Sequence, residues 1–142
     1  MKDALDFVDI KTVGCAEERV TEENTAARYG SGSLHVYSTP AMIALMERAA
    51  VAAVDEKVPQ GWVTVGTSIA ISHVDATPLD IMVSARAELV EIDRRRLVFH
   101  VSATDEWGSI GHGTHERFCV NVERFVEKVE SKEKDSRDSA RI

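Results

Sequence analysis

The longest apolar segment of the chain, residues 39–54, predicts a helix that is buried on most sides. Its sequence, TPAMIALMERAAVAAV, is apolar almost all the way round. Thr39 followed by Pro40 is typical of a helix start, with Thr39 as the N-cap and Pro40 as the first helical residue. The helix is expected to end before the Pro-Gln-Gly break at residues 59–61.

Residues 62–122 have the alternating pattern of β-strands. Four strands are predicted there, and because short turns link them, neighbouring strands are expected to pair antiparallel. Every second residue should face the helix. The inward positions are expected to be Val63, Val65, Thr67, Ile69, Ile71 and His73; then Ile81, Val83, Ala85, Ala87 and Leu89; then Leu97, Phe99, Val101 and Ala103; and finally Phe118, Val120 and Val122.

The two ends of the chain are less regular. A first strand is predicted within residues 8–20, followed by a short helix with Thr21 as its N-cap, ending before Gly30. The last residues, 127–142, are mostly charged and predict a frayed or disordered tail without chemistry. We therefore expect one domain over residues 1–126 and a charged tail over 127–142.

These elements together predict an α+β fold. One long apolar helix needs a cover, and a curved antiparallel sheet wrapped around it would bury both apolar surfaces. The long edge strands of such a sheet would be exposed. Two copies are therefore expected to join edge to edge as a dimer.

Composition narrows the choice of partners. With 142 residues the chain can bury an ordinary core, and its formal net charge of -7 argues against nucleic acid. No apolar run approaches the ~20 residues of a membrane span, and the N-terminus is too acidic for a secretory signal. Two cysteines without a CxxC motif favour a reducing cytoplasm. The Arg94–Arg96 run lies between two strands and is interpreted as an exposed turn, with attraction of a phosphorylated ligand as the alternative.

Glu47 is the most informative residue, because it lies in a helical row with Ile43, Ala50 and Val54. A carboxylate on the flank of an apolar stripe needs a partner, since burial of an unpaired charge is costly. Proteins often keep such residues for chemistry.

His73 continues the apolar face of its strand in phase with Ile69 and Ile71, so it should point toward the helix. A glutamate from the helix and a histidine from the sheet are therefore expected to meet inside the fold. The alternative is a core histidine that is simply hydrogen-bonded. Thr39 is also ambiguous: its hydroxyl could cap the helix or face an anionic ligand at the helix N-terminus.

The segment GHGTHERF, residues 111–118, is polar for a strand, and its two glycines indicate a bulge or a close approach. His112 and His115 are three residues apart, which puts them on opposite faces of a strand. A metal site formed by this pair is therefore not expected.

Three segments, STPAMIALMERAAVAAV (38–54), VGTSIAISHVDATP (65–78) and GHGTHERF (111–118), occur in an order and spacing that resemble one known family. They are similar to the hotdog-fold thioesterases of the fluoroacetyl-CoA thioesterase family. The likeness runs from about residue 25 to about residue 128. The resemblance implies a hotdog fold, a homodimer or a tetramer built from such dimers, active sites near the dimer interface, and an acyl-CoA substrate.

The resemblance also implies the roles of five residues. Thr39, Glu47 and His73 match the catalytic Thr, Glu and His of the family at the same intervals. Gly66 matches a glycine whose backbone lies near the thioester carbonyl, and Arg117 matches an arginine near the bound substrate. Neither a metal nor a cofactor is expected.

One departure concerns the acyl group. Aromatic residues before the helix cover the acyl pocket of the fluoroacetyl enzyme, whereas here Tyr29, His35 and Tyr37 are the only rings in that stretch. We therefore expect a thioesterase for a short-chain acyl-CoA or another small thioester, and the fluorinated substrate is not carried over. The alternatives are a non-catalytic acyl-CoA or small-ligand binding protein and, third, a hotdog dehydratase.

Overall fold

The computed structural model describes residues 8–140. In chain order the elements are β1 (Val13–Arg19), the short 3-10 helix η2 (Glu22–Asn24), α1 (Ala26–Tyr29), α2 (Thr39–Val54), β2 (Trp62–His73), β3 (Met82–Asp93), β4 (Arg96–Asp105), β5 (Gly108–Asn121) and α3 (Val122–Ala140). The prediction of one long helix followed by four strands is confirmed.

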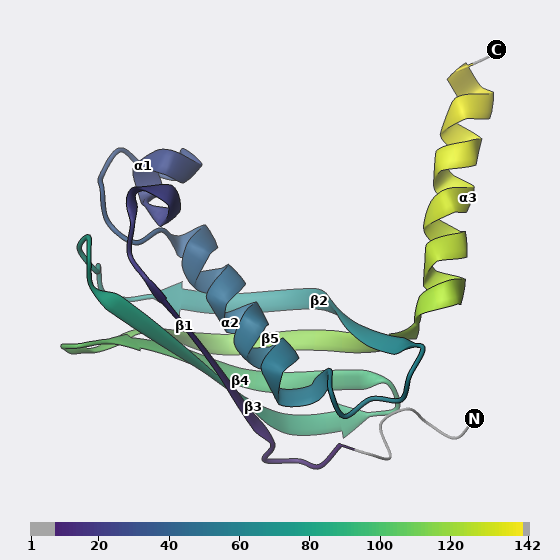
Figure 1. Cartoon of the computed structure of the whole chain (residues 1–142), viewed down its shortest axis with the longest axis horizontal. Coiled ribbons are helices and arrows are strands. Elements are labelled where there is room, and N and C mark those ends of the chain that lie inside the picture. Colours follow the sequence, from purple (N-terminus) through teal and green to yellow (C-terminus); the bar gives the residue numbers. More distant parts are fainter. Residues whose placement is uncertain (1–7, 141–142) are drawn as a thin grey trace.

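The five strands form one antiparallel sheet in the order β1-β3-β4-β5-β2. Figure 1 shows the sheet curling around α2, which crosses one face. The core lies between them: the apolar side of α2 packs against the buried residues of β3 and β4. This arrangement confirms the predicted α+β fold, and it leaves β1 and β2 as the edge strands.

The start of α2 differs by one residue from the prediction. Ser38, not Thr39, is the N-cap: its backbone is extended and its hydroxyl accepts a hydrogen bond from the Ala41 amide at 3.1 Å. Thr39 is the first helical residue, and Pro40 follows it. Because Ser38 satisfies the helix end, the Thr39 hydroxyl is available for another partner.

The segment before α2 is capped as its sequence indicates, but it is split in two. Thr21 caps η2 in a capping box with Asn24, and Thr25 caps α1 by accepting from the Arg28 amide. Gly30 ends α1 in the left-handed conformation, with φ of 70°, which glycine adopts without a Cβ clash.

A β-bulge in β2 overturns part of the predicted inward face. The register against β5 shifts between Gly66 and Ser68. Before the bulge Thr64 is buried and Val63 is 38% exposed, whereas beyond it Ile71 and His73 are half-buried. One extra residue in a strand reverses which side chains face the core. The assignment of Val63 and Val65 to the same face as His73 was therefore wrong.

The predicted face of β5 was also wrong. Phe118 is exposed, as is Val122 just after the strand, and the buried side chains of β5 are Ile110, His115, Arg117 and Cys119. Hydrophobicity alone predicts that Phe118 rather than Arg117 faces the core, because an arginine is rarely buried unless it has partners. In β3 and β4 the predicted inward residues from Val83 to Leu89 and from Leu97 to Ala103 are buried as expected.

The charged tail begins as a helix rather than as a disordered segment. Residues 122–140 contain no Gly or Pro and are rich in Glu and Lys, which favour helix. Figure 1 shows α3 leading away from the sheet, and its apolar side chains Val122, Phe125, Val126 and Val129 are exposed. Among residues 8–140, no helix combines the length and apolarity that a membrane span needs.

Candidate active site

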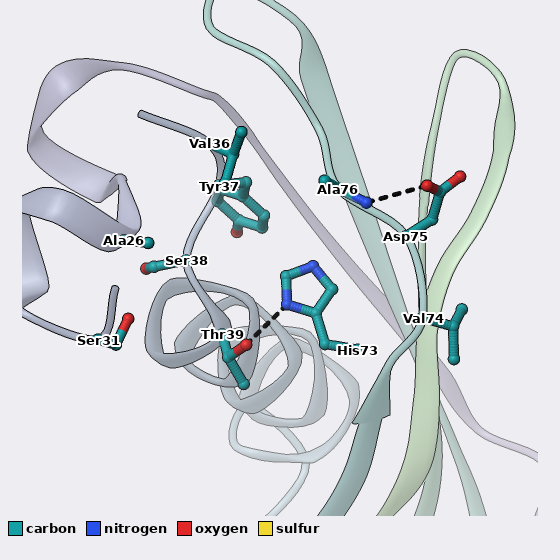
Figure 2. Close-up of a pocket in the computed structure, with 10 residues that line it drawn as sticks. All are labelled: Ala26, Ser31, Val36, Tyr37, Ser38, Thr39, His73, Val74, Asp75 and Ala76. Atoms are coloured by element: carbon teal, nitrogen blue, oxygen red, sulfur yellow. Dashed lines mark hydrogen bonds between the residues drawn. The ribbon is translucent and has the colours of Figure 1, made fainter. Parts of the chain in front are cut away.

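Thr39 and His73 form a hydrogen-bonded pair between the first residue of α2 and the last residue of β2. The Thr39 Oγ1 and His73 Nδ1 atoms are 2.8 Å apart. Figure 2 shows the imidazole turned from the end of β2 toward the first turn of α2. The other ring nitrogen, Nε2, is buried and has no hydrogen-bond partner in the described part of the chain.

Burial lowers the pKa of His73, and the backbone and carboxylate of nearby Asp75 oppose this shift. The ring is therefore kept neutral more readily than a histidine in water. A neutral imidazole has one N–H donor and one acceptor nitrogen. The His73 ring can therefore take a proton at one of its nitrogens and give one from the other.

The pair lies on the wall of an open cavity of about 280 Å³. The residues that line it come from the segment that leads into the first residue of α2 and from the end of β2 with the loop after it, namely Ala26, Ser31, Val36, Tyr37, Ser38, Thr39, His73, Val74, Asp75 and Ala76. The positive end of the α2 dipole points toward this region, which favours developing negative charge.

Of the three rings predicted near the acyl pocket, one lines the cavity. Tyr37 is buried, and its hydroxyl donates to Glu18 at 2.6 Å. Tyr29 is exposed, and His35 pairs with Glu22 at 2.9 Å outside the cavity. These three rings therefore do not form an aromatic cover.

Glu47 lies two helical turns beyond Thr39, about 12 Å along α2. Its Oε2 atom is 3.7 Å from Nη1 of Arg117, and 42% of its side-chain surface is exposed. It also lies against Gly66, where an added Cβ would be 2.9 Å from Oε2. The partner that Glu47 was expected to need is thus Arg117.

Glu47 and His73 do not meet within one protomer. Glu47 lies beside Gly66, seven residues before His73 on the same strand, which corresponds to about 20 Å of strand. Among the residues that the structure describes, no hydrogen bond or ion pair joins the two side chains. The expected meeting of helix glutamate and sheet histidine is therefore not found inside a single chain.

Arg117 and His115 form a buried polar cluster whose packing the sequence did not reveal. Arg117 donates from Nε to Thr64 Oγ1 at 2.8 Å and from Nη2 to Thr64 O at 2.9 Å. Its Nη1 is 3.2 Å from His115 Nε2, and His115 Nδ1 is 2.8 Å from Ser68 O. The available signal was the two-residue spacing of His115, Arg117 and Cys119 along β5.

His112 is exposed and His115 is buried, so the two histidines lie on opposite faces of β5 as predicted. Within the described ranges, no group of three or more His, Cys, Asp or Glu side chains is placed to hold a metal ion.

The sheet order and the enclosed helix define the hotdog fold. A hot-dog-like protein from Thermanaerovibrio acidaminovorans superposes with a TM-score of 0.83 at 24% identity, over 92% of this chain and 96% of that one. The solved structure of the fluoroacetyl-CoA thioesterase FlK superposes with a TM-score of 0.82 at 33% identity, over 89% and 98%. A variant of FlK was solved in complex with acetyl-CoA.

The sequence profile described as fluoroacetyl-CoA-specific thioesterase matches residues 20–123. The fluoroacetyl-CoA thioesterase of Streptantibioticus cattleyicolor is 41% identical over 97 residues, which cover 68% of this chain and 70% of that protein. The chain belongs to the fluoroacetyl-CoA-specific thioesterase family. The predicted resemblance is confirmed, and so is the predicted class of enzyme, a thioester hydrolase.

Proposed function

We propose that this protein hydrolyses small acyl-CoA thioesters with Thr39, Glu47 and His73. The observation that carries the proposal is the 2.8 Å contact of Thr39 with His73 on the wall of a cavity at the N-terminus of α2. A hydroxyl, an imidazole and a helix N-terminus together suit a reaction that moves a proton and builds charge on an oxygen. Family membership supports the thioester as the reacting group.

In this proposal each residue has a separate task. The Glu47 carboxylate activates a water molecule or attacks the thioester carbonyl itself. His73 moves the proton toward the leaving thiolate, and the Thr39 hydroxyl holds the carboxylate or the oxyanion. The backbone at Gly66 lies beside Glu47, which supports its predicted place near the thioester carbonyl. The predicted substrate contact of Arg117 stays a prediction. The burial of the Arg117 side chain favours a role in positioning Glu47 instead.

The acyl group is proposed to be short, with no requirement for fluorine. The cavity is small, and Tyr37 is the one ring of the three that lines it. A strict preference for fluoroacetyl groups is therefore not carried over from the relatives. A cytoplasmic location also belongs to this proposal.

We further propose that the complete site forms in a homodimer joined at β2. This strand is a 12-residue edge of the sheet, and a long unpaired edge favours pairing with a second copy. A twofold axis makes two such strands antiparallel. The His73 end of one strand then lies toward the Trp62 end of the other, nearer to Glu47 of the partner subunit.

The direct test is hydrolysis of a panel of acyl-CoA thioesters, measured by release of the CoA thiol. We expect turnover by wild type and a loss of about a hundredfold or more in Glu47→Gln, with an unchanged melting temperature. Glu56→Gln changes an exposed glutamate just beyond α2 and should keep full activity. Acyl-CoA binding by calorimetry without thiol release over hours would instead identify a binding protein.

A further inference from the structure

The guanidinium group of Arg117, which faces Glu47, is buried and hydrogen-bonded to protein atoms. The Arg117 side chain is 7% exposed, and three of its nitrogens have partners inside the protein. We propose that Arg117 is a positioning residue that holds the Glu47 carboxylate toward the thioester, while Thr64 and His115 hold the guanidinium. This inference rests on the proposed function, because it assigns Glu47 the reacting carboxylate.

The hydrogen-bond network fixes the direction of each donor. Thr64 Oγ1 accepts from Arg117 Nε, so its own proton is free to go to Asp55 Oδ1 at 2.5 Å. His115 must donate from Nδ1, because Ser68 O only accepts. In the neutral ring Nε2 is then the acceptor for Arg117 Nη1.

The neutral state of His115 fits this network. Burial lowers the pKa of His115, and the Arg117 charge lowers it further, whereas the Ser68 carbonyl and the carboxylates of Glu47 and Glu116 oppose the shift. A protonated ring could not accept from Nη1 and would repel the guanidinium. The buried Arg117 charge is compensated by the carboxylates of Asp55 and Glu47.

Glu47 is held on one side and open on the other. Its Oε2 atom faces Nη1 at 3.7 Å, which is an ion pair rather than a close hydrogen bond, and 42% of the side chain remains exposed. Gly66 gives the carboxylate room, because an added Cβ would lie 2.9 Å from Oε2. A carboxylate that reacts needs this combination of a fixed position and an open face.

A substrate contact would require a different arrangement. The three donors with partners are committed to protein atoms, and the guanidinium has almost no exposed surface. The charge can therefore act on the reaction through Glu47 rather than by touching the acyl-CoA.

The test is a double-mutant cycle of Arg117→Met with Glu47→Gln. We expect Arg117→Met to lower kcat by about ten to a hundredfold, with KM within about twofold of wild type. In the Glu47→Gln background the same change should lower the residual kcat no further. A rise in KM at unchanged kcat, or the full loss of kcat in the Glu47→Gln background, would overturn the inference and indicate direct substrate contact.

Thr64→Val provides a milder second variant if Arg117→Met does not fold. It keeps the shape of Thr64 and removes the oxygen that holds Nε, so kcat should fall by a smaller factor at unchanged KM. Arg96→Met is the matched control, since Arg96 pairs with Glu91 and Glu116 on the outer face, and it should turn over like wild type. Wild-type kcat in Thr64→Val would also contradict the inference. The proposed function is tested separately: it fails if wild type releases no thiol from acyl-CoA, or if Glu47→Gln keeps wild-type activity.

Discussion

Two polar pairs of α2 face the sheet at different points along β2. Thr39 and His73 are neutral partners on the wall of a cavity, whereas Glu47 and Arg117 are a charged pair. The first pair suits proton transfer and the second suits a fixed negative charge. Their separate environments keep an imidazole neutral at one point and a carboxylate paired at the other.

Gly66→Ala tests the approach of Glu47 to the sheet. The new Cβ would lie 2.9 Å from the carboxylate and 3.3 Å from His115 Cε1, so the flexible end of Glu47 must move. We expect kcat to fall by about tenfold or more, with a change in unfolding free energy of about 1 kcal/mol or less. Thiol-release kinetics and urea unfolding measure the two effects.

Gly32→Ala is the control for Gly66→Ala, because its Cβ would make an ordinary 3.5 Å contact with Ala26 Cβ. It should leave both kcat and stability close to wild type. An unchanged kcat in Gly66→Ala would show that the carboxylate does not depend on this space.

Stability should fall as the pH is lowered through 6.5, the ordinary pKa of histidine. Burial lowers the pKa of both His73 and His115 in the folded protein. The unfolded chain therefore binds more protons below pH 6.5, so the stability present above this pH is lost as the pH falls toward the folded pKa values. Urea unfolding at pH 7.5 and 5.5 measures the loss.

His115→Gln should weaken this pH dependence, because it removes one of the two imidazoles whose pKa is lowered in the folded protein. His112→Gln changes an exposed histidine of the same strand. Its free energy of unfolding should depend on pH as strongly as that of wild type. If wild type and both variants lose the same stability between pH 7.5 and 5.5, His115 does not contribute to the pH dependence.

At the scale of elements, β1 and α2 touch at a glycine. A Cβ on Gly14 would lie 2.1 Å from the Ala49 carbonyl oxygen and 2.4 Å from the Ala53 amide nitrogen. These are backbone atoms, so the helix itself would have to move. We expect Gly14→Ala to lower the free energy of unfolding by about 2 kcal/mol or more, measured by urea unfolding. A loss no larger than that of Gly32→Ala would contradict the close packing.

How well each element could be predicted depends on whether its pattern is uninterrupted. The helix α2 and the inner faces of β3 and β4 have long regular patterns, and the structure agrees with them from Val83 to Ala103. In β2 a bulge at Gly66 reverses the faces, and hydropathy has no signal for an extra residue. In α3 the charged composition hid a helix that contains neither Gly nor Pro.

At the scale of the whole molecule, the fold and family could be predicted from three short segments, but the site could not be assembled from them. The burial of Arg117 depends on Thr64 of β2, on Asp55 just after the end of α2 and on His115 of β5. Such a network exists only once the strands are paired. For the same reason, sequence patterns placed Glu47 and His73 on facing surfaces of the helix and the sheet. They did not show that Glu47 lies beside Gly66, far along β2 from His73.

Subunit mixing tests whether the partner completes the site. If Glu47 of one protomer works with His73 of the other, a heterodimer of Glu47→Gln and His73→Ala has one doubly defective site and one intact site. Half of a random mixture is heterodimer, so about a quarter of wild-type activity should return on co-expression. If both residues act within one chain, every site keeps one defect and no activity returns. Each variant expressed alone is the control, and a failure to recover activity in a mixture of proven dimers would place Glu47 and His73 in the same protomer's site.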